Sequence, residues 1–509
     1  MSQRTILRYL RYILSGVFLG AFALKISALP GKYYLGIVGA TFVMAPATYI
    51  YLIISPHTKT RLLALFVAMF TFGIAFNLDY NFFYRDYVGV TSVDLSVSLL
   101  SLMVVFGFLV YDARLSYEGT YHFHVNAKIF YALMMYIGAG TLSIISAEHL
   151  DLSFLELARL VSLLFLMFVV MNLQDRKYID ILLLSLSVCV VLEAGIGLYQ
   201  FKTGHTLGLH VFGEKEVILQ DIGFVARRAT GTIGDPNIFG YFFEMLIPLM
   251  FAMFIVERRL WIKSWYAFAS CMGCVGIYTT LSRGAWMTLP ISVILVFLIL
   301  FRGRFLRLST IIWIWCAAFV FSAILFASFP VVYKRFTHDD YGSADTRGPL
   351  NEAAFSVIRQ FPVFGVGLNN MAIVFKKYDT TGYSRMFVGK NHVVHNLYLQ
   401  IWTEVGTVGL AAFLWMLIVS LYTAFRHFYK VHYWDRGVLA GLATGILAQT
   451  IHGMVDPGFK IMMNMSMLFY TYIGLIGAIS ILYRTEKSQG IVRITMNDGE
   501  AGYGNRAPL

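Results

Sequence analysis

The chain alternates long apolar runs with short polar loops over most of its length. Many of the runs are close to the roughly 20 residues that a membrane-spanning helix needs. We predict about fourteen spans (12–14) from their length and spacing. They lie near residues 12–29, 34–55, 62–77, 92–111, 129–147, 154–172, 179–200, 237–256, 266–281, 285–301, 311–329, 396–424, 438–454 and 462–483. The pattern predicts an all-α polytopic membrane protein.

The composition agrees with this class, because 58% of the 509 residues are hydrophobic and only 13% are charged. A soluble chain of this length would need far more charge to cover its surface. The net charge of +12 is typical of basic loops that anchor spans on the cytoplasmic side, and it does not require a nucleic acid partner. Cys271 and Cys274 form a CxxC inside an apolar run, and we interpret them as small packing residues.

The basic residues of the short loops predict the topology. They concentrate in the N-terminal segment and in alternate loops, at residues 57–61, 175–177, 257–263, 302–307 and 426–430. The positive-inside rule therefore places both termini in the cytoplasm. Two long segments, 201–236 and 330–395, then lie on the periplasmic side. Helical apolar spacing over 351–361 predicts that the larger loop is partly helical.

We divide the chain into three parts. Residues 1–178 form N-terminal transmembrane helices without a chemical signature. Residues 179–483, including the loop 330–395, form a catalytic membrane domain. Residues 484–509 form a polar, Gly-rich cytoplasmic tail.

Candidate chemistry gathers on the predicted periplasmic side, in four groups of polar residues. They are Arg228 with its neighbour Arg227, Arg283 in an S-R-G turn, Arg347 in the large loop, and His395-Asn396 with Glu404 further along the same span. The planar guanidinium fork of arginine suits phosphate oxygens. A histidine titrates near neutral pH and can take a proton from a hydroxyl.

Each of these residues has a simpler interpretation. An arginine at the membrane surface can anchor to lipid phosphate, and Gly284 can serve only the tight turn after Arg283. His395 can cap a helix. Glu404 can pair with an arginine for structure, because a carboxylate inside a span is costly unless it is paired.

Three further observations concern polar residues in or beside spans. Glu156 and Arg159 are spaced i,i+3 and are expected to pair with each other. His452 and Asp456 close a span on the periplasmic side and are candidate supporting groups. The Gly-Asp-Pro-Asn at 234–237 predicts a helix start with outward-facing N–H groups, which suit a phosphate.

Taken in order, these motifs resemble a known family. The order is an Arg followed by Gly and Pro-Asn (228–237), S-R-G (282–284), an Arg with P-x-x-G-x-G (347 and 362–367), and H-N with E-x-G (395–406). This set resembles the bacterial O-antigen ligase and O-antigen (exopolysaccharide) polymerase superfamily over roughly residues 180–480. The resemblance implies a membrane glycosyltransferase that needs no metal or other cofactor. Its donor would be a glycan on undecaprenyl pyrophosphate, at the periplasmic face of the bacterial inner membrane.

The resemblance also implies roles for the residues. Arg228 and Arg283 would bind the pyrophosphate, and His395 would activate the acceptor hydroxyl. The further substrate-binding candidates are Arg347, Arg227, Asn237, Asn396 and Glu404. Independently, the departing pyrophosphate needs its developing negative charge stabilised, and two arginines can do this in place of a divalent cation. Direct attack by the acceptor would invert the anomeric centre.

The acceptor remains open between two possibilities. The segments 228–237 and 395–410 favour a polymerase, whose acceptor is a lipid-linked repeat unit. A ligase would transfer the glycan to lipid A core, and the basic residues of the large loop would suit that acceptor. A transporter or flippase for lipid-linked sugars is a third possibility. It would be expected to show internal repeats and charges near the bilayer midplane, and we find no such repeat.

Overall fold

The computed structural model describes residues 56–76, 79–82, 93–115, 123–221, 225–301, 334, 347–382 and 393–489. The chain divides into two units, residues 1–66 and residues 67–509. The candidate site belongs entirely to the second unit. The spans expected at 12–29, 34–55 and 311–329 lie outside the described residues, and the three-part division of the chain stays a prediction.

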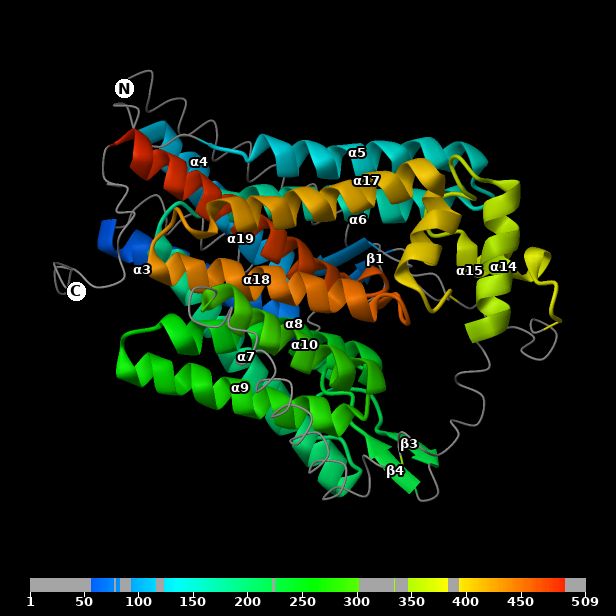
Figure 1. Ribbon diagram of the computed structural model, residues 1–509, viewed down its shortest axis with the longest axis horizontal. Coiled ribbons are helices and arrows are strands. Elements are labelled where there is room, and N and C mark those ends of the chain that lie inside the picture. Colours follow the sequence, from blue (N-terminus) through cyan, green and yellow to red (C-terminus); the bar gives the residue numbers. More distant parts are fainter. Residues whose placement is uncertain are drawn as a thin grey trace, which may run out of the picture. The chain divides into compact units, whose positions relative to one another are not determined.

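Helices follow the predicted spans wherever the chain is described (Figure 1). They are α3 (Pro56–Ala75), α4 (Val97–Leu115), α5 (Ala127–Ser143), α6 (Leu150–Met171), α7 (Arg176–Thr203), α8 (Pro236–Val256), α9 (Leu260–Thr280), α10 (Arg283–Leu300), α17 (Leu397–Phe428), α18 (Tyr433–His452) and α19 (Met463–Ser488). Seven helices in the described ranges are long and apolar enough to cross a membrane: α5 with its 3₁₀ extension, α6, α7, α8, α10, α17 and α19. The all-α class is confirmed. The count of fourteen and the side on which the termini lie stay predictions.

Two short antiparallel hairpins interrupt the helical pattern and were not predicted. One pairs β1 (Asp79–Phe82) with β2 (Val93–Ser96). The other pairs β3 (Ile218–Asp221) with β4 (Val225–Arg228), inside the segment 201–236. Short 3₁₀ helices occur as η1 (Ile144–Ser146), η2 (His210–Phe212) and η3 (Gly458–Lys460). The strands have four residues each, too few for a clear period-2 pattern in the sequence.

The large loop contains α14 (Arg347–Gln360) and α15 (Met371–Tyr378), so its described part is helical as expected. The two helices share an apolar core that includes Val357, Phe375 and Val394. In Figure 1 they lie beyond the N-terminus of α17, and β3 and β4 lie at the same ends of the long helices. We call this end of the second unit the loop end.

A row of glycines fixes α18 against α8. Gly437, Gly441 and Gly445 recur every four residues, as in the small-residue motifs that let membrane helices approach closely. A methyl group on Gly441 would lie 2.5 Å from Cα of Leu249, and one on Gly445 would lie 2.7 Å from the carbonyl oxygen of Met245. This contact sets the end of α18 beside the start of α8, where the candidate site lies.

Helix α17 is broken at Gly406, which has φ 68° and ψ −171°. The chain after α14 supplies hydrogen bonds at the break. The Thr407 N–H donates to the Pro362 carbonyl at 2.9 Å, and the Gly367 N–H donates to the Glu404 carbonyl at 3.0 Å. The P-x-x-G-x-G and E-x-G motifs therefore form one interlocked structure. This contact attaches the large loop to a span.

Cys271 and Cys274 lie on α9 as free thiols, and the described residues leave both side chains exposed. Their interpretation as packing residues within the membrane stays a prediction.

Candidate functional site

The Gly-Asp-Pro-Asn motif begins α8 as predicted. Asp235 caps the helix, and its Oδ1 accepts hydrogen bonds from the N–H groups of Asn237 at 2.8 Å and Ile238 at 3.0 Å. Burial raises the pKa of the Asp235 carboxyl, although the Ile238 N–H and the Arg228 charge oppose this. The expectation that these N–H groups face outward for a phosphate is wrong, because the Asp235 side chain occupies them.

Arg227 and Arg228 point to opposite sides of β4, as neighbouring strand residues do. Arg227 is exposed and donates to the Lys202 carbonyl at 2.5 Å. Arg228 is only 9% exposed. Its Nε donates to the Thr280 carbonyl at 2.9 Å, and its Nη2 donates to Oδ1 of Asn237 at 2.7 Å. Asn237 is thus a partner of Arg228.

The segment that follows Arg228 is held by polar side chains of α7. Oε1 of Gln200 accepts from the N–H groups of Thr230 at 3.0 Å and Gly231 at 2.9 Å. Oε2 of Glu193 accepts from the Thr232 N–H at 3.1 Å. Buried polar side chains of a span therefore fix this loop and hold Arg228 in place.

Arg283 begins α10, immediately after the turn that Arg228 contacts through Thr280. Gly284 lies inside α10 and does not serve the turn alone. A methyl group there would lie 2.6 Å from Cδ2 and 2.7 Å from Cε1 of His452. The glycine of S-R-G is therefore needed because the imidazole of His452 packs directly on the helix backbone.

His452 joins three helices at this point. Its Nδ1 lies 2.7 Å from Oε2 of Glu244 on α8. Its ring stacks on Tyr241 with 4.1 Å between ring centroids. The Tyr241 hydroxyl donates to the Asp456 carbonyl at 2.7 Å. The predicted supporting groups His452 and Asp456 thus meet through Tyr241, which the sequence analysis did not single out.

Asp456 faces His395. Nδ1 of His395 lies 3.6 Å from Oδ2 of Asp456, which is beyond hydrogen-bond length. Burial opposes ionisation of Asp456, but His395, His452 and the Gly458 N–H hold its pKa below the usual value. His395 is 36% exposed, so its ring remains accessible.

Asn396 and Arg347 complete the surroundings of His395. Oδ1 of Asn396 caps α17 by accepting from the Tyr398 N–H at 2.9 Å, and its Nδ2 donates to the Met454 carbonyl at 2.9 Å. Arg347 begins α14, and its charge interacts with the phenol of Tyr241. Asn396 therefore positions the segment that carries His395, and Arg347 lies close enough to act on the same group of side chains.

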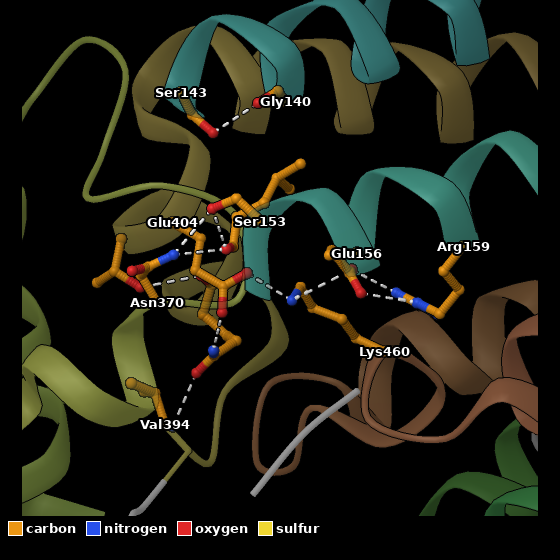
Figure 2. Close-up of polar contacts among 12 residues, drawn as sticks. Gly140, Ser143, Ser153, Glu156, Arg159, Asn370, Val394, Glu404 and Lys460 are labelled. Carbon is orange, nitrogen blue, oxygen red and sulfur yellow. Dashed lines mark hydrogen bonds and ion pairs between the residues drawn. The ribbon is translucent and has the colours of Figure 1, made fainter. Parts of the chain in front are cut away.

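Glu404 lies deeper in α17, in the buried chain of charges shown in Figure 2. Its Oε2 accepts from Nζ of Lys460 at 2.5 Å, so it pairs with a lysine and not with an arginine. Lys460 is also 3.7 Å from Glu156. The predicted pairing of Glu156 with Arg159 is confirmed, with 2.5 Å between Oε1 and Nη2. The structure adds Lys460, which links that pair to Glu404.

Several of the predicted residues belong to elements that meet at the loop end, and we call this group the arginine–histidine cluster. Its members are Arg228, Arg283, Arg347, His395, Tyr241, His452 and Asp456. Across the described ranges, no group of three or more His, Cys, Asp or Glu side chains is placed to hold a metal ion. Whether the protein acts without a metal stays a prediction.

The fold and this cluster describe a multi-pass helical membrane protein with a group of polar and charged residues at one end of its helices. Residues 267–414 match a family model described as O-antigen ligase. This confirms the resemblance of the chain to the O-antigen ligase and polymerase superfamily. The match includes Arg283, Arg347, His395, Asn396 and Glu404, and it begins after Arg228 and Asn237. No curated protein matches the chain.

Proposed function

We propose that the protein is a metal-independent, inverting glycosyltransferase of the bacterial inner membrane. It uses a glycan on undecaprenyl pyrophosphate at the periplasmic face. The observation that carries this proposal is the arginine–histidine cluster, which joins residues from β4, α8, α10, α14, α18, the segment just before α17 and the α18–α19 connection. The family match over 267–414 supports the same class of reaction.

The arginines form the donor side of the site. Arg228 and Arg283 both stand at the α9–α10 turn, and Arg228 is held there by Thr280 and Asn237. As the bond from C1 of the sugar to the phosphate breaks, they stabilise the charge that develops on the departing pyrophosphate. Arg347 is a third donor-binding candidate. The exposed Arg227 lies on the other side of β4, so we assign it no role in stabilising the departing pyrophosphate.

His395 forms the acceptor side. The acceptor oxygen attacks C1, the bond from C1 to pyrophosphate breaks, and the hydroxyl proton passes to Nε2 of His395. Nδ1 faces the carboxylate of Asp456, which stabilises the imidazolium that forms. One direct displacement inverts the anomeric centre. We assign Asn396 and Glu404 to holding α17 and not to substrate contact, because their polar atoms bond to the protein.

We favour a repeat-unit polymerase, whose acceptor is a second lipid-linked unit. A ligase that transfers glycan to lipid A core is the second candidate, and the description of the matching family favours it. The two share the donor chemistry and differ only in the acceptor.

Purified protein incubated with a lipid-linked repeat unit, with and without lipid A core, separates these possibilities. A ladder without core indicates a polymerase, and a shift of the core band indicates a ligase. Donor that is moved across vesicles but chemically unchanged would indicate a transporter. Arg228→Ala, Arg283→Ala and His395→Ala should each abolish transfer, with Arg227→Ala as the matched active control. A product with retained configuration, or activity lost in EDTA, would refute the mechanism.

A further inference from the structure

Lys460 is a buried cation close to the candidate site, and the cluster does not use it. It ends η3 and is 7% exposed. Its Nζ donates to Oε2 of Glu404 at 2.5 Å. On its own segment it stands near Asp456, whose Oδ1 accepts from the Gly458 N–H at 2.9 Å. The lysine therefore ties the segment that carries Asp456 to α17.

A second line of contacts leads from Glu404 to His395, the residue that faces Asp456. Oε1 of Glu404 accepts from Nε2 of Gln400 at 2.5 Å. Oε1 of Gln400 accepts from the Val394 N–H at 2.8 Å, and Val394 immediately precedes His395. Figure 2 shows Val394, Glu404 and Lys460 along this line. We call this chain of contacts, from Lys460 through Glu404 and Gln400 to Val394, the circuit. Its two ends carry Asp456 and His395, whose Oδ2 and Nδ1 atoms lie 3.6 Å apart.

The circuit is anchored in the helix bundle. Nζ of Lys460 lies 3.7 Å from Oε1 of Glu156 on α6. Arg159 pairs with Glu156 and donates to the Ser466 hydroxyl on α19 at 2.5 Å. A buried charge that loses its partner is costly, so each member holds its neighbour at a defined position.

We propose that Lys460 and Glu404 are positioning residues that set the separation of His395 and Asp456. This inference rests on the proposed function. The pair sits just beyond hydrogen-bond length, a distance that can close when substrate binds. A circuit that fixes both flanking segments holds the carboxylate in line with Nδ1, so that Nε2 is presented to the acceptor.

The test replaces the charges of Lys460 and Glu404 together, because either single substitution would leave one buried charge without its main partner. In Lys460→Met/Glu404→Gln the amide at 404 can still bond to Gln400, and the stack of Phe459 on Phe413 remains, but the charged link between η3 and α17 is lost. We expect kcat for glycan transfer to fall on the order of a hundredfold, as for a misplacement of about 1 Å. KM for the lipid-linked donor should stay unchanged, because Arg228 and Arg283 are held by other elements.

The matched control is Asp435→Asn. It removes the charge of buried Asp435, which lies 2.7 Å from the partly exposed Arg176, at the opposite ends of the long helices. Its melting temperature should fall while its kcat per folded protein stays at the wild-type value. Gln400→Leu interrupts the circuit from the α17 side and should reproduce the kcat loss. Together the two circuit variants test the role even if one of them folds poorly.

A cycle with Asp456→Asn distinguishes positioning from general support. If the circuit acts through the His395–Asp456 pair, adding Lys460→Met/Glu404→Gln to Asp456→Asn should cause little further loss of kcat. Losses that multiply, or a folded double variant with wild-type kcat, would overturn the inference while leaving the proposed function intact. A wild type that transfers no glycan would instead refute the proposed function itself.

Discussion

Gly284→Ala tests whether the glycine of S-R-G serves a turn or a close approach. If it served only the turn, alanine would be neutral or would stabilise α10 by up to about 1 kcal/mol. The structure predicts the opposite. The new methyl would lie 2.6 Å from Cδ2 of His452, whereas ordinary contact begins at 3.4 Å. Nε2 of the same ring would lie closer still, so the imidazole must move by more than about 0.8 Å, the difference between these two values.

That movement would disturb the contacts of His452 with Glu244 at 2.7 Å and with Tyr241 at 4.1 Å. A hydrogen bond to a charged group contributes about 1.5–3 kcal/mol, which exceeds the gain in helix propensity. Because Tyr241 also holds Asp456, the displacement reaches the pair that includes His395. We expect a lower melting temperature and a loss of transfer rate on the order of ten- to a hundredfold.

The assay measures the initial rate of glycan transfer in proteoliposomes, together with the melting temperature of the same preparation. Gly195→Ala is the matched control, since no atom of the described residues outside its own helix backbone lies within 4 Å of a methyl group at that helical position. It should keep both wild-type values. A Gly284→Ala variant with the activity and stability of the control would show that the contact with His452 has no role in the site.

Three other substitutions test different parts of the structure. Gly441→Ala places a methyl group 2.5 Å from Cα of Leu249, and since a backbone atom cannot rotate away, both melting temperature and transfer should fall. Gly406→Ala puts a side chain at φ 68°, so transfer should fall and limited proteolysis within 361–367 should accelerate. Asp456→Asn should lower the melting temperature above about pH 5. Because the pKa of Asp456 is depressed, the difference in melting temperature between wild type and variant should narrow as the pH falls below 3.8. A difference that does not change with pH would contradict a stabilising role for the Asp456 carboxylate.

The sequence predicts the helices well because the signal for each one, a long apolar run, lies within a single continuous segment. It also predicts the start of α8, where Asp235 and Pro236 are local signals for a helix N-terminus. It does not predict the α17 break, because that conformation depends on hydrogen bonds to residues 362–367. The P-x-x-G-x-G and E-x-G motifs are visible in the sequence, but nothing local shows that they contact each other.

The candidate site shows the same division. Arg228, Arg283 and His395 can be singled out because they lie beside apolar runs on the predicted periplasmic side, where basic residues are not needed as topology anchors. Their supports are harder to find, since Tyr241 lies in an apolar run and the contact of Gly284 with His452 spans distant segments. Two signals were available: the four-residue repeat of glycine over 437–445, and the lysine at 460 beside an apolar span.

The arrangement of the cluster predicts how its variants divide kinetically. Arg228 and Arg283 depend on α7, α8 and the α9–α10 turn, whereas His395 and Asp456 depend on α17 and the α18–α19 connection. Tyr241 joins the two sides, since it lies on α8, stacks on His452 and donates a hydrogen bond to the Asp456 carbonyl. Changes to the arginine side should therefore weaken donor binding and also slow transfer, whereas changes to the histidine side should slow only the chemistry with bound donor. A substitution of Tyr241 should weaken donor binding and slow the chemical step, because this side chain contacts both sides of the cluster.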